Sequence, residues 1–148
     1  MKAVVTVTQS GADTATEATI PTYINGDNLT GWSIVGVRAY WKNAYLAGAV
    51  DGYLKATVQT VTGALEFGAA DLLAMCERQH ILGAAGDVVI DPVMEALPID
   101  NHVTVQPTLY CRVASLGTGV ANVVVFEVYY ELTKLKQVEF LQLQVGGS

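Results

Sequence analysis

The sequence predicts an all-β sandwich in a single domain that spans residues 1–148. Segments rich in Val, Thr and aromatic residues, which suit the pleated surface of a sheet, recur along the whole chain. Clusters of Gly, Asn, Asp and Pro separate these segments, and turns favour such residues. A chain of this length suits one ordinary domain and can bury roughly two-thirds of its unfolded surface.

Eight segments are expected as strands. They lie near residues 2–9, 18–24, 32–41, 53–62, 87–91, 102–114, 120–133 and 138–145. The first is too short and too rich in threonine for the apolar region of a signal peptide. The residues at 25–28, Asn-Gly-Asp-Asn, are typical of a turn between the second and third strands.

The third strand carries apolar and aromatic residues on both faces. This pattern favours a strand that is covered on both sides. One face would hold Trp32, Ile34, Gly36, Arg38 and Tyr40, and the other would hold Ser33, Val35, Val37, Ala39 and Trp41.

One segment, residues 69–81, is expected as a helix that caps an open end of the sandwich. Leu72, Leu73, Met75 and Cys76 recur with helical spacing, and Gly83 would end the helix. Two prolines, at positions 92 and 98, then favour an extended connection to the sixth strand.

The sixth and seventh strands are expected to form a long hairpin over residues 102–133. Gly117 and Gly119 between them supply the positive backbone angles that a tight reversal needs. Alternate residues of the seventh strand share a face. The uncharged face, with Val124, Phe126 and Val128, is expected in the core, and the opposite face would present Val123, Val125, Glu127 and Tyr129 to neighbours or solvent.

Eight antiparallel strands in one domain leave two main architectures, a jelly roll and an immunoglobulin-like sandwich. The immunoglobulin pattern places a Trp between two Cys, whereas Trp32 and Trp41 both precede Cys76 and Cys111. The sequence therefore favours an eight-stranded antiparallel jelly roll with one short inserted helix. Two cysteines are too few for a disulfide framework, and both are expected as buried thiols.

Charged residues are scarce and scattered. They make up 15% of the chain, against ~25% in an average domain, and the formal net charge is −6. An exterior with so few charges indicates burial against partners. Neither end carries a basic arm, so strong direct binding of nucleic acid is not expected. No apolar run approaches the ~18 residues of a membrane span.

The ionisable residues form no recognisable catalytic, cofactor or metal motif. Cys76 and His80 would face the same way on a helix, but further metal ligands are missing. Asp87 and Asp91 would lie about 13 Å apart on a regular strand, too far to share a proton. The turn at 25–28 lacks the ligand spacing of a calcium loop, and residues 63–68 lack that of a phosphate loop. We therefore do not expect an enzyme.

Aromatic residues are the better candidates for a functional surface. Tyr40, Trp41 and Tyr45 cluster after the third strand, where they would stack on a sugar, anchor a protein interface or pack in the core. Together with Glu127 and Tyr129 they form the candidate interface.

As a whole, the pattern resembles a single jelly-roll capsid protein of an icosahedral virus. The resemblance covers nearly the full chain and rests on the strand series, including the closing segments 123–132 and 140–143. It implies a structural protein of the virion, made in the host cytoplasm, that assembles with copies of itself and with other capsid proteins and has no active site. The alternatives are a trimeric spike or decoration domain and a carbohydrate-binding module that uses Tyr40, Trp41 and Tyr45.

Overall fold

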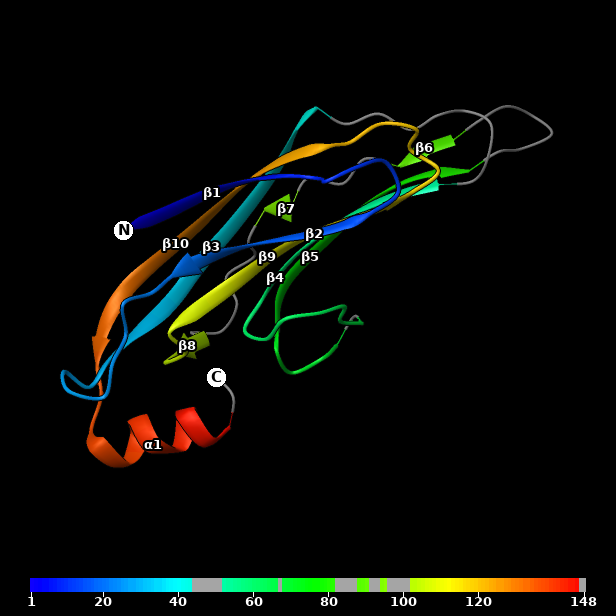
Figure 1. The fold of residues 1–148 in the computed structure, drawn as a ribbon. Coiled ribbons are helices and arrows are strands. Elements are labelled where there is room, and N and C mark those ends of the chain that lie inside the picture. Colours follow the sequence, from blue (N-terminus) through cyan, green and yellow to red (C-terminus); the bar gives the residue numbers. More distant parts are fainter. Residues whose placement is uncertain (44–51, 67, 82–87, 91–93, 96–101, 147–148) are drawn as a thin grey trace.

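The computed structural model describes residues 1–43, 52–66, 68–81, 88–90, 94–95 and 102–146, which form two antiparallel sheets and one helix. In sheet A the order is β1 (Lys2–Thr8), β10 (Val123–Lys134) and β3 (Thr30–Asn43), and β3 also pairs with the short strands β7 (Met94–Glu95) and β8 (His102–Thr104). In sheet B the order is β2 (Ala15–Pro21), β9 (Thr108–Leu116), β4 (Gly52–Gln59), β5 (Leu72–Ile81) and β6 (Val88–Ile90). The helix α1 (Gln137–Val145) lies at one end (Figure 1).

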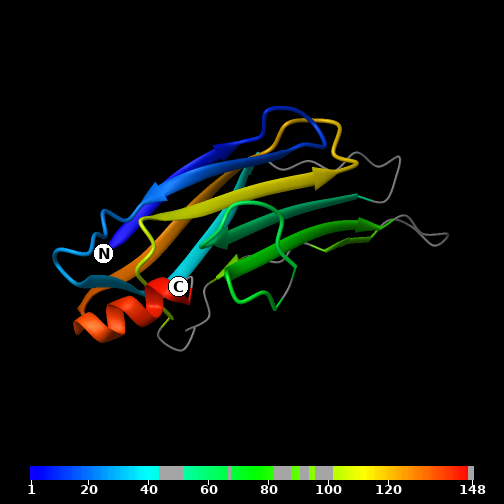
Figure 2. The ribbon, with the colours of Figure 1, turned by 60° about the horizontal axis from the view of Figure 1, so that its bottom comes forward.

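The chain alternates between the sheets, so each sheet joins strands that are distant in sequence. The first and last strands, β1 and β10, are neighbours in sheet A, and β2 and β9 are neighbours in sheet B. The orders β1-β10-β3-β8 and β2-β9-β4-β5 are those of a jelly roll. The predicted all-β jelly-roll sandwich is confirmed, and the strands of both sheets run along the long direction of the molecule (Figure 2).

The core lies between the two sheets. The expected inner face of the last strand is confirmed, because Val124, Phe126 and Val128 are fully buried. Opposite them, sheet B contributes Leu109, Val113 and other apolar side chains of the same cluster. Toward one end the rings of Trp32 and Tyr130 stack with their centroids 3.6 Å apart.

The helix predicted over residues 69–81 is wrong, because residues 72–81 form the strand β5. β5 pairs with β4 on one side and with β6 on the other. Its inner face carries Ala74 and Cys76, which pack on the core, and the alternate residues Met75 and Glu77 are only partly buried. Pairing with β4 along the strand, and with β6 over residues 79–81, outweighs the helix propensity of this segment.

The strand predicted over residues 138–145 is also wrong, because this segment forms α1. The backbone N–H of Lys136 donates to a side-chain oxygen of Glu139 at 2.8 Å, which closes the first turn. Phe140 is the one buried side chain of the helix. The sequence had suggested a helix inserted between strands. The helix instead follows the last strand, β10.

The hairpin expected over residues 102–133 is wrong as well. Residues 102–104 form β8 in sheet A, and the chain then crosses to sheet B, where β9 begins at Thr108. After β9 it crosses back, so β9 and β10 lie in different sheets. The expected positive φ of Gly117 and Gly119 is confirmed, at 69° for each, but the reversal joins two sheets.

A network of buried polar groups satisfies the backbone at this crossing. The Gln9 side chain accepts hydrogen bonds from the backbone and side-chain nitrogens of Asn122, at 2.9 and 3.0 Å, and donates to Ser115. Asp13 accepts from the backbone N–H of Thr118 at 2.8 Å. Since Gln9 and Asn122 are buried, these bonds fix the β1–β2 turn to the β9–β10 connection.

A β-bulge in β3 explains why neither face of this strand looked polar. Tyr129 pairs with Gly36 and Tyr130 pairs with Ile34, so Val35 has no opposite residue and the faces exchange there. Ile34 is buried before the bulge and Val37 after it. The expected cover on both sides is confirmed before the bulge, where Trp32, Ser33 and Ile34 are all buried, and is wrong from Val35 onward, where Arg38 and Tyr40 are also exposed. The turn at 25–28 is confirmed, with the Asn25 side chain accepting the Asp27 N–H at 3.0 Å.

Candidate interaction surfaces

The outer face of sheet A holds three of the five candidate interface residues. Glu127 lies opposite Arg38 in β3, and Tyr40 lies opposite Val125, two residues before Glu127. Tyr129 follows Glu127 on the same face of β10. The fourth candidate, Tyr45, lies outside the described residues.

Glu127 is the centre of a polar cluster on this face. Its carboxylate accepts a hydrogen bond from the Tyr129 hydroxyl at 2.7 Å and from Lys2 at 3.4 Å, and it lies 3.9 Å from Arg38. The hydrogen bond from Tyr129 holds the pKa of Glu127 below its usual value, helped by the charges of Lys2 and Arg38. The same bond raises the pKa of Tyr129. Only 11% of the Glu127 side chain is exposed, so its own neighbours cover it.

The fifth candidate, Trp41, lies on the other face of the sheet from Tyr40. Trp41 pairs with Val124 and packs against the core, whereas Tyr40 is 38% exposed. The guanidinium of Arg38 lies over the Tyr40 ring, 5.2 Å from its centroid. The structure therefore does not bring Tyr40 and Trp41 together on one platform for stacking a sugar.

Cys76 and His80 do not face the same way on a helix, because the segment that contains them is the strand β5. Because Cys76 and His80 lie on a strand, they are about 13 Å apart along it. Both cysteines are thiols buried in the core, as expected, and burial raises the pKa of Cys111 to about 12. Asp87 and Asp91 lie outside the described residues. In the described part of the chain no three His, Cys, Asp or Glu side chains gather as a metal site would require.

Helix α1 presents an apolar face that the strand interpretation of this segment had missed. Val138, Leu141 and Val145 are 65%, 50% and 88% exposed and line a shallow depression. Their spacing of three and four residues is the sequence signal that could have revealed this face. Among the described segments no helix is long and apolar enough to cross a membrane.

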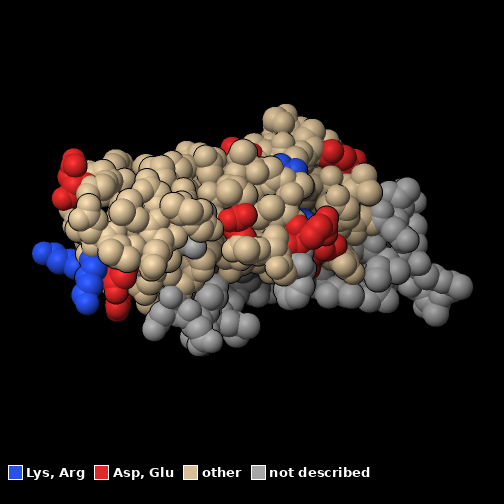
Figure 3. Space-filling model, turned by 90° about the horizontal axis from the view of Figure 1, so that it is seen from below, with Lys and Arg blue, Asp and Glu red and all other residues tan. Residues whose placement is uncertain are grey.

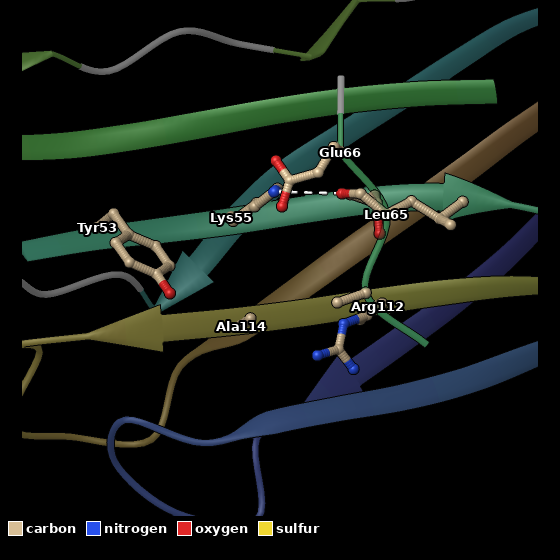
Figure 4. Close-up of a pocket in the computed structure, with 8 residues that line it drawn as sticks. Tyr53, Lys55, Leu65, Glu66, Arg112 and Ala114 are labelled. Atoms are coloured by element: carbon tan, nitrogen blue, oxygen red, sulfur yellow. Dashed lines mark hydrogen bonds between the residues drawn. The ribbon is translucent and has the colours of Figure 1, made fainter. Parts of the chain in front are cut away.

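A pocket lies on the outer face of sheet B, beside the loop residues 64–66. Its volume is about 170 Å³, and β4, β9 and the loop supply its walls. Figure 4 shows Tyr53 and Arg112 on either side of Ala114, with Lys55 and Glu66 on a third side. Sequence reasoning did not find this pocket, because it depends on which strands become neighbours and on the path of the loop.

No protein-family model matches the chain, and no curated protein matches it significantly in sequence. The fold and the chemistry of these surfaces are therefore the basis for assigning a function.

Proposed function

We propose that this chain is a capsid shell protein of an icosahedral virus, which assembles with copies of itself through the outer surfaces of its jelly roll. The observation that carries the proposal is the strand order, β1-β10-β3-β8 in one sheet and β2-β9-β4-β5 in the other. Jelly rolls of this kind build viral capsids, although lectins and cupins share the architecture. The surface must therefore supply the rest of the support.

The outer face of sheet A suits contact with a neighbouring copy. Lys2 and Arg38 neutralise Glu127, and Tyr40 and Tyr129 add aromatic area with polar groups. Tyrosine and arginine are enriched at protein interfaces for this reason. Because Lys2 and Arg38 offset the charge of Glu127, little electrostatic repulsion would oppose the packing of copies against this face. Another side of the molecule, seen from below in Figure 3, carries separate spots of charge on a mostly uncharged surface.

The end of the sandwich that carries α1 supplies the apolar contact. The exposed side chains of Val138, Leu141 and Val145 lie on one face of α1. Leu132, near the end of β10, is 56% exposed. Monomeric proteins rarely leave large contiguous apolar patches in water. In the proposed shell a neighbouring copy covers the exposed face of α1.

Negative-stain electron microscopy of the purified chain tests this function. We expect closed shells, pentamers or hexamers. A lone trimer would instead favour a spike or decoration protein, and a monomer at every concentration would contradict the proposal.

A pair of matched variants tests the assigned contact. The double variant Val138→Ser with Leu141→Ser should keep the circular dichroism spectrum but lose the assemblies. The control, Val120→Ser, changes a side chain that is 40% exposed in the β9–β10 connection and should assemble normally. If both variants assemble equally well, α1 is not part of the interface.

A further inference from the structure

The pocket on the outer face of sheet B is a preformed hollow with its own supports. Glu17 in β2 accepts hydrogen bonds from the Thr62 hydroxyl at 2.6 Å and from the Gly63 N–H at 3.1 Å. The Gln59 side chain, which is fully buried, donates to the carbonyl of Val61 at 2.7 Å and to that of Gly63. These bonds tie residues 61–63, at the start of the loop, to β2 and β4. A ligand would therefore meet a wall that is already in place, which lowers the cost of binding.

Two cations, Lys55 and Arg112, line this pocket, and neither forms an ion pair with a described residue. The described part of the chain contains two ion pairs, and both belong to Glu127 on the opposite sheet. Glu17 lies beside Arg112 in the register of β2 and β9, but its two carboxylate oxygens already bind the loop. Lys55 donates one hydrogen bond, to the carbonyl of Leu65 at 3.3 Å, which leaves two of its three protons available. The pocket is thus suited to an anion.

The other lining groups narrow the choice of anion. Tyr53 offers a ring face and a hydroxyl, and the exposed Glu66 carboxylate can accept hydrogen bonds from hydroxyl groups. The small side chain of Ala114 leaves room between them (Figure 4). A carboxylate in the pocket would repel a doubly charged phosphate more than a singly charged carboxylate. A volume of about 170 Å³, below the ~300 Å³ of typical small-molecule sites, suits one ring.

We propose that this pocket binds a sugar acid, a single sugar ring that carries a carboxylate. Arg112 and Lys55 bind the carboxylate, Glu66 accepts hydrogen bonds from ring hydroxyls, and Tyr53 packs against the ring. This site lies on the sheet opposite the Glu127 cluster. It goes beyond the proposed shell function and does not depend on it.

Nuclear magnetic resonance titration or calorimetry of the full chain with glucuronate tests the site. We expect saturable binding that shifts the amide signals of Lys55, Ala64 and Ala114, with glucose as the uncharged control binding at least about tenfold more weakly, since charge-assisted hydrogen bonds are the stronger ones. The ligand could be a free sugar acid or the end residue of a glycan, and methyl glucuronide distinguishes the two. If it binds as tightly as glucuronate, the ligand is the end residue of a glycan, and if only glucuronate binds, the ligand is the free acid.

Variants of the lining residues test whether glucuronate binds in this pocket. Arg112→Gln and Lys55→Gln should each weaken glucuronate about tenfold or more, because each removes a charged donor. Ala114→Leu, which fills the hollow and keeps both charges, should also abolish binding. Lys134→Gln, an exposed cation at the far end of β10, is the matched control and should bind as the wild type does.

Three results would overturn the inference. They are the absence of binding at millimolar glucuronate, equal binding of glucose, and unchanged affinity in folded Arg112→Gln and Ala114→Leu. Calorimetry measures all three results in monomers and in assemblies, and the contacts assigned to the shell lie on sheet A and α1, away from this pocket, so the outcome is independent of whether the chain forms shells.

Discussion

Single side chains decide which faces of the strands are buried and which are not. In β10 the alternation of Phe126 and Glu127 separates the core from the outer face, and it could be predicted from the sequence because neighbouring strand residues point to opposite sides. The partners of Glu127 could not be predicted. Lys2, Arg38 and Tyr129 reach the carboxylate only because β1 and β3 flank β10.

Truncation of Phe126 should unfold much of the protein. We expect Phe126→Ala to lower the free energy of unfolding by about 3–5 kcal/mol, because it removes a fully buried ring. Urea denaturation measures the change. The control Val4→Ala, at a side chain that is 53% exposed on β1, should stay within about 0.5 kcal/mol of the wild type. Equal losses in the two variants would show that the faces have been wrongly assigned.

Tyr129 should make stability depend on the charge of Glu127. Because the folded pKa of Glu127 is lowered, its contribution is present above the unfolded value of about 4.3 and is lost as the pH falls through the folded pKa. Tyr129→Phe removes the main cause of that shift. Denaturation at neutral and acidic pH should therefore show the variant less stable at neutral pH and nearly equal to the wild type in acid. Tyr40→Phe is the control, and a loss that persists in acid would contradict this role.

Cys111 should give the opposite pH dependence. Its folded pKa of about 12 lies above the unfolded value of about 8.5, so its contribution is full below the unfolded value and is lost as the pH rises toward 12. Cys111→Val removes this titration and keeps an apolar side chain. The stability difference between the two proteins should shift in favour of the variant at alkaline pH. A difference that does not change with pH would show that the thiol is not held neutral by burial.

At the scale of elements, the sequence predicted strands well where alternation was clear and failed where local and tertiary preferences disagree. β1, β4 and β10 lie close to their expected positions. Residues 72–81 have helix-forming side chains but become β5, because β4 pairs along nearly the whole strand and β6 pairs with its last three residues. The sequence contains no local sign of those partners. α1 did carry a local sign, the spacing of Val138, Leu141 and Val145, which was outweighed by the apolar character of the segment.

Helix α1 should depend on one buried side chain. We expect Phe140→Ala to release the helix from the sandwich while the sheets remain folded, because Phe140 is its only buried residue. Hydrogen exchange should then become fast across residues 137–145 and stay slow in β10. Gln144→Ala, at an exposed position of the same helix outside its apolar face, should leave exchange unchanged. Loss of protection throughout β10 in Phe140→Ala would show that helix and sheet fold as one unit.

At the scale of the whole molecule, the sandwich could be predicted from the sequence but the pairing of its strands could not. The long apolar segments over residues 102–133 suggested a hairpin, although the chain crosses between sheets before Thr108 and again after Leu116. Alternation shows which face of a strand is apolar but not which strand lies beside it. The pocket of Lys55 and Arg112 was missed for the same reason, because β4 and β9 meet only in the finished fold.

Self-association is the central claim at this scale, and sedimentation velocity of the purified chain tests it most directly. Profiles recorded from low to tens of micromolar concentration should show particles of five or more copies that grow at the expense of the monomer. The exposed apolar face of α1 and the nearly neutral outer face of sheet A are the physical reason for this expectation. A single monomer boundary at every concentration would contradict it.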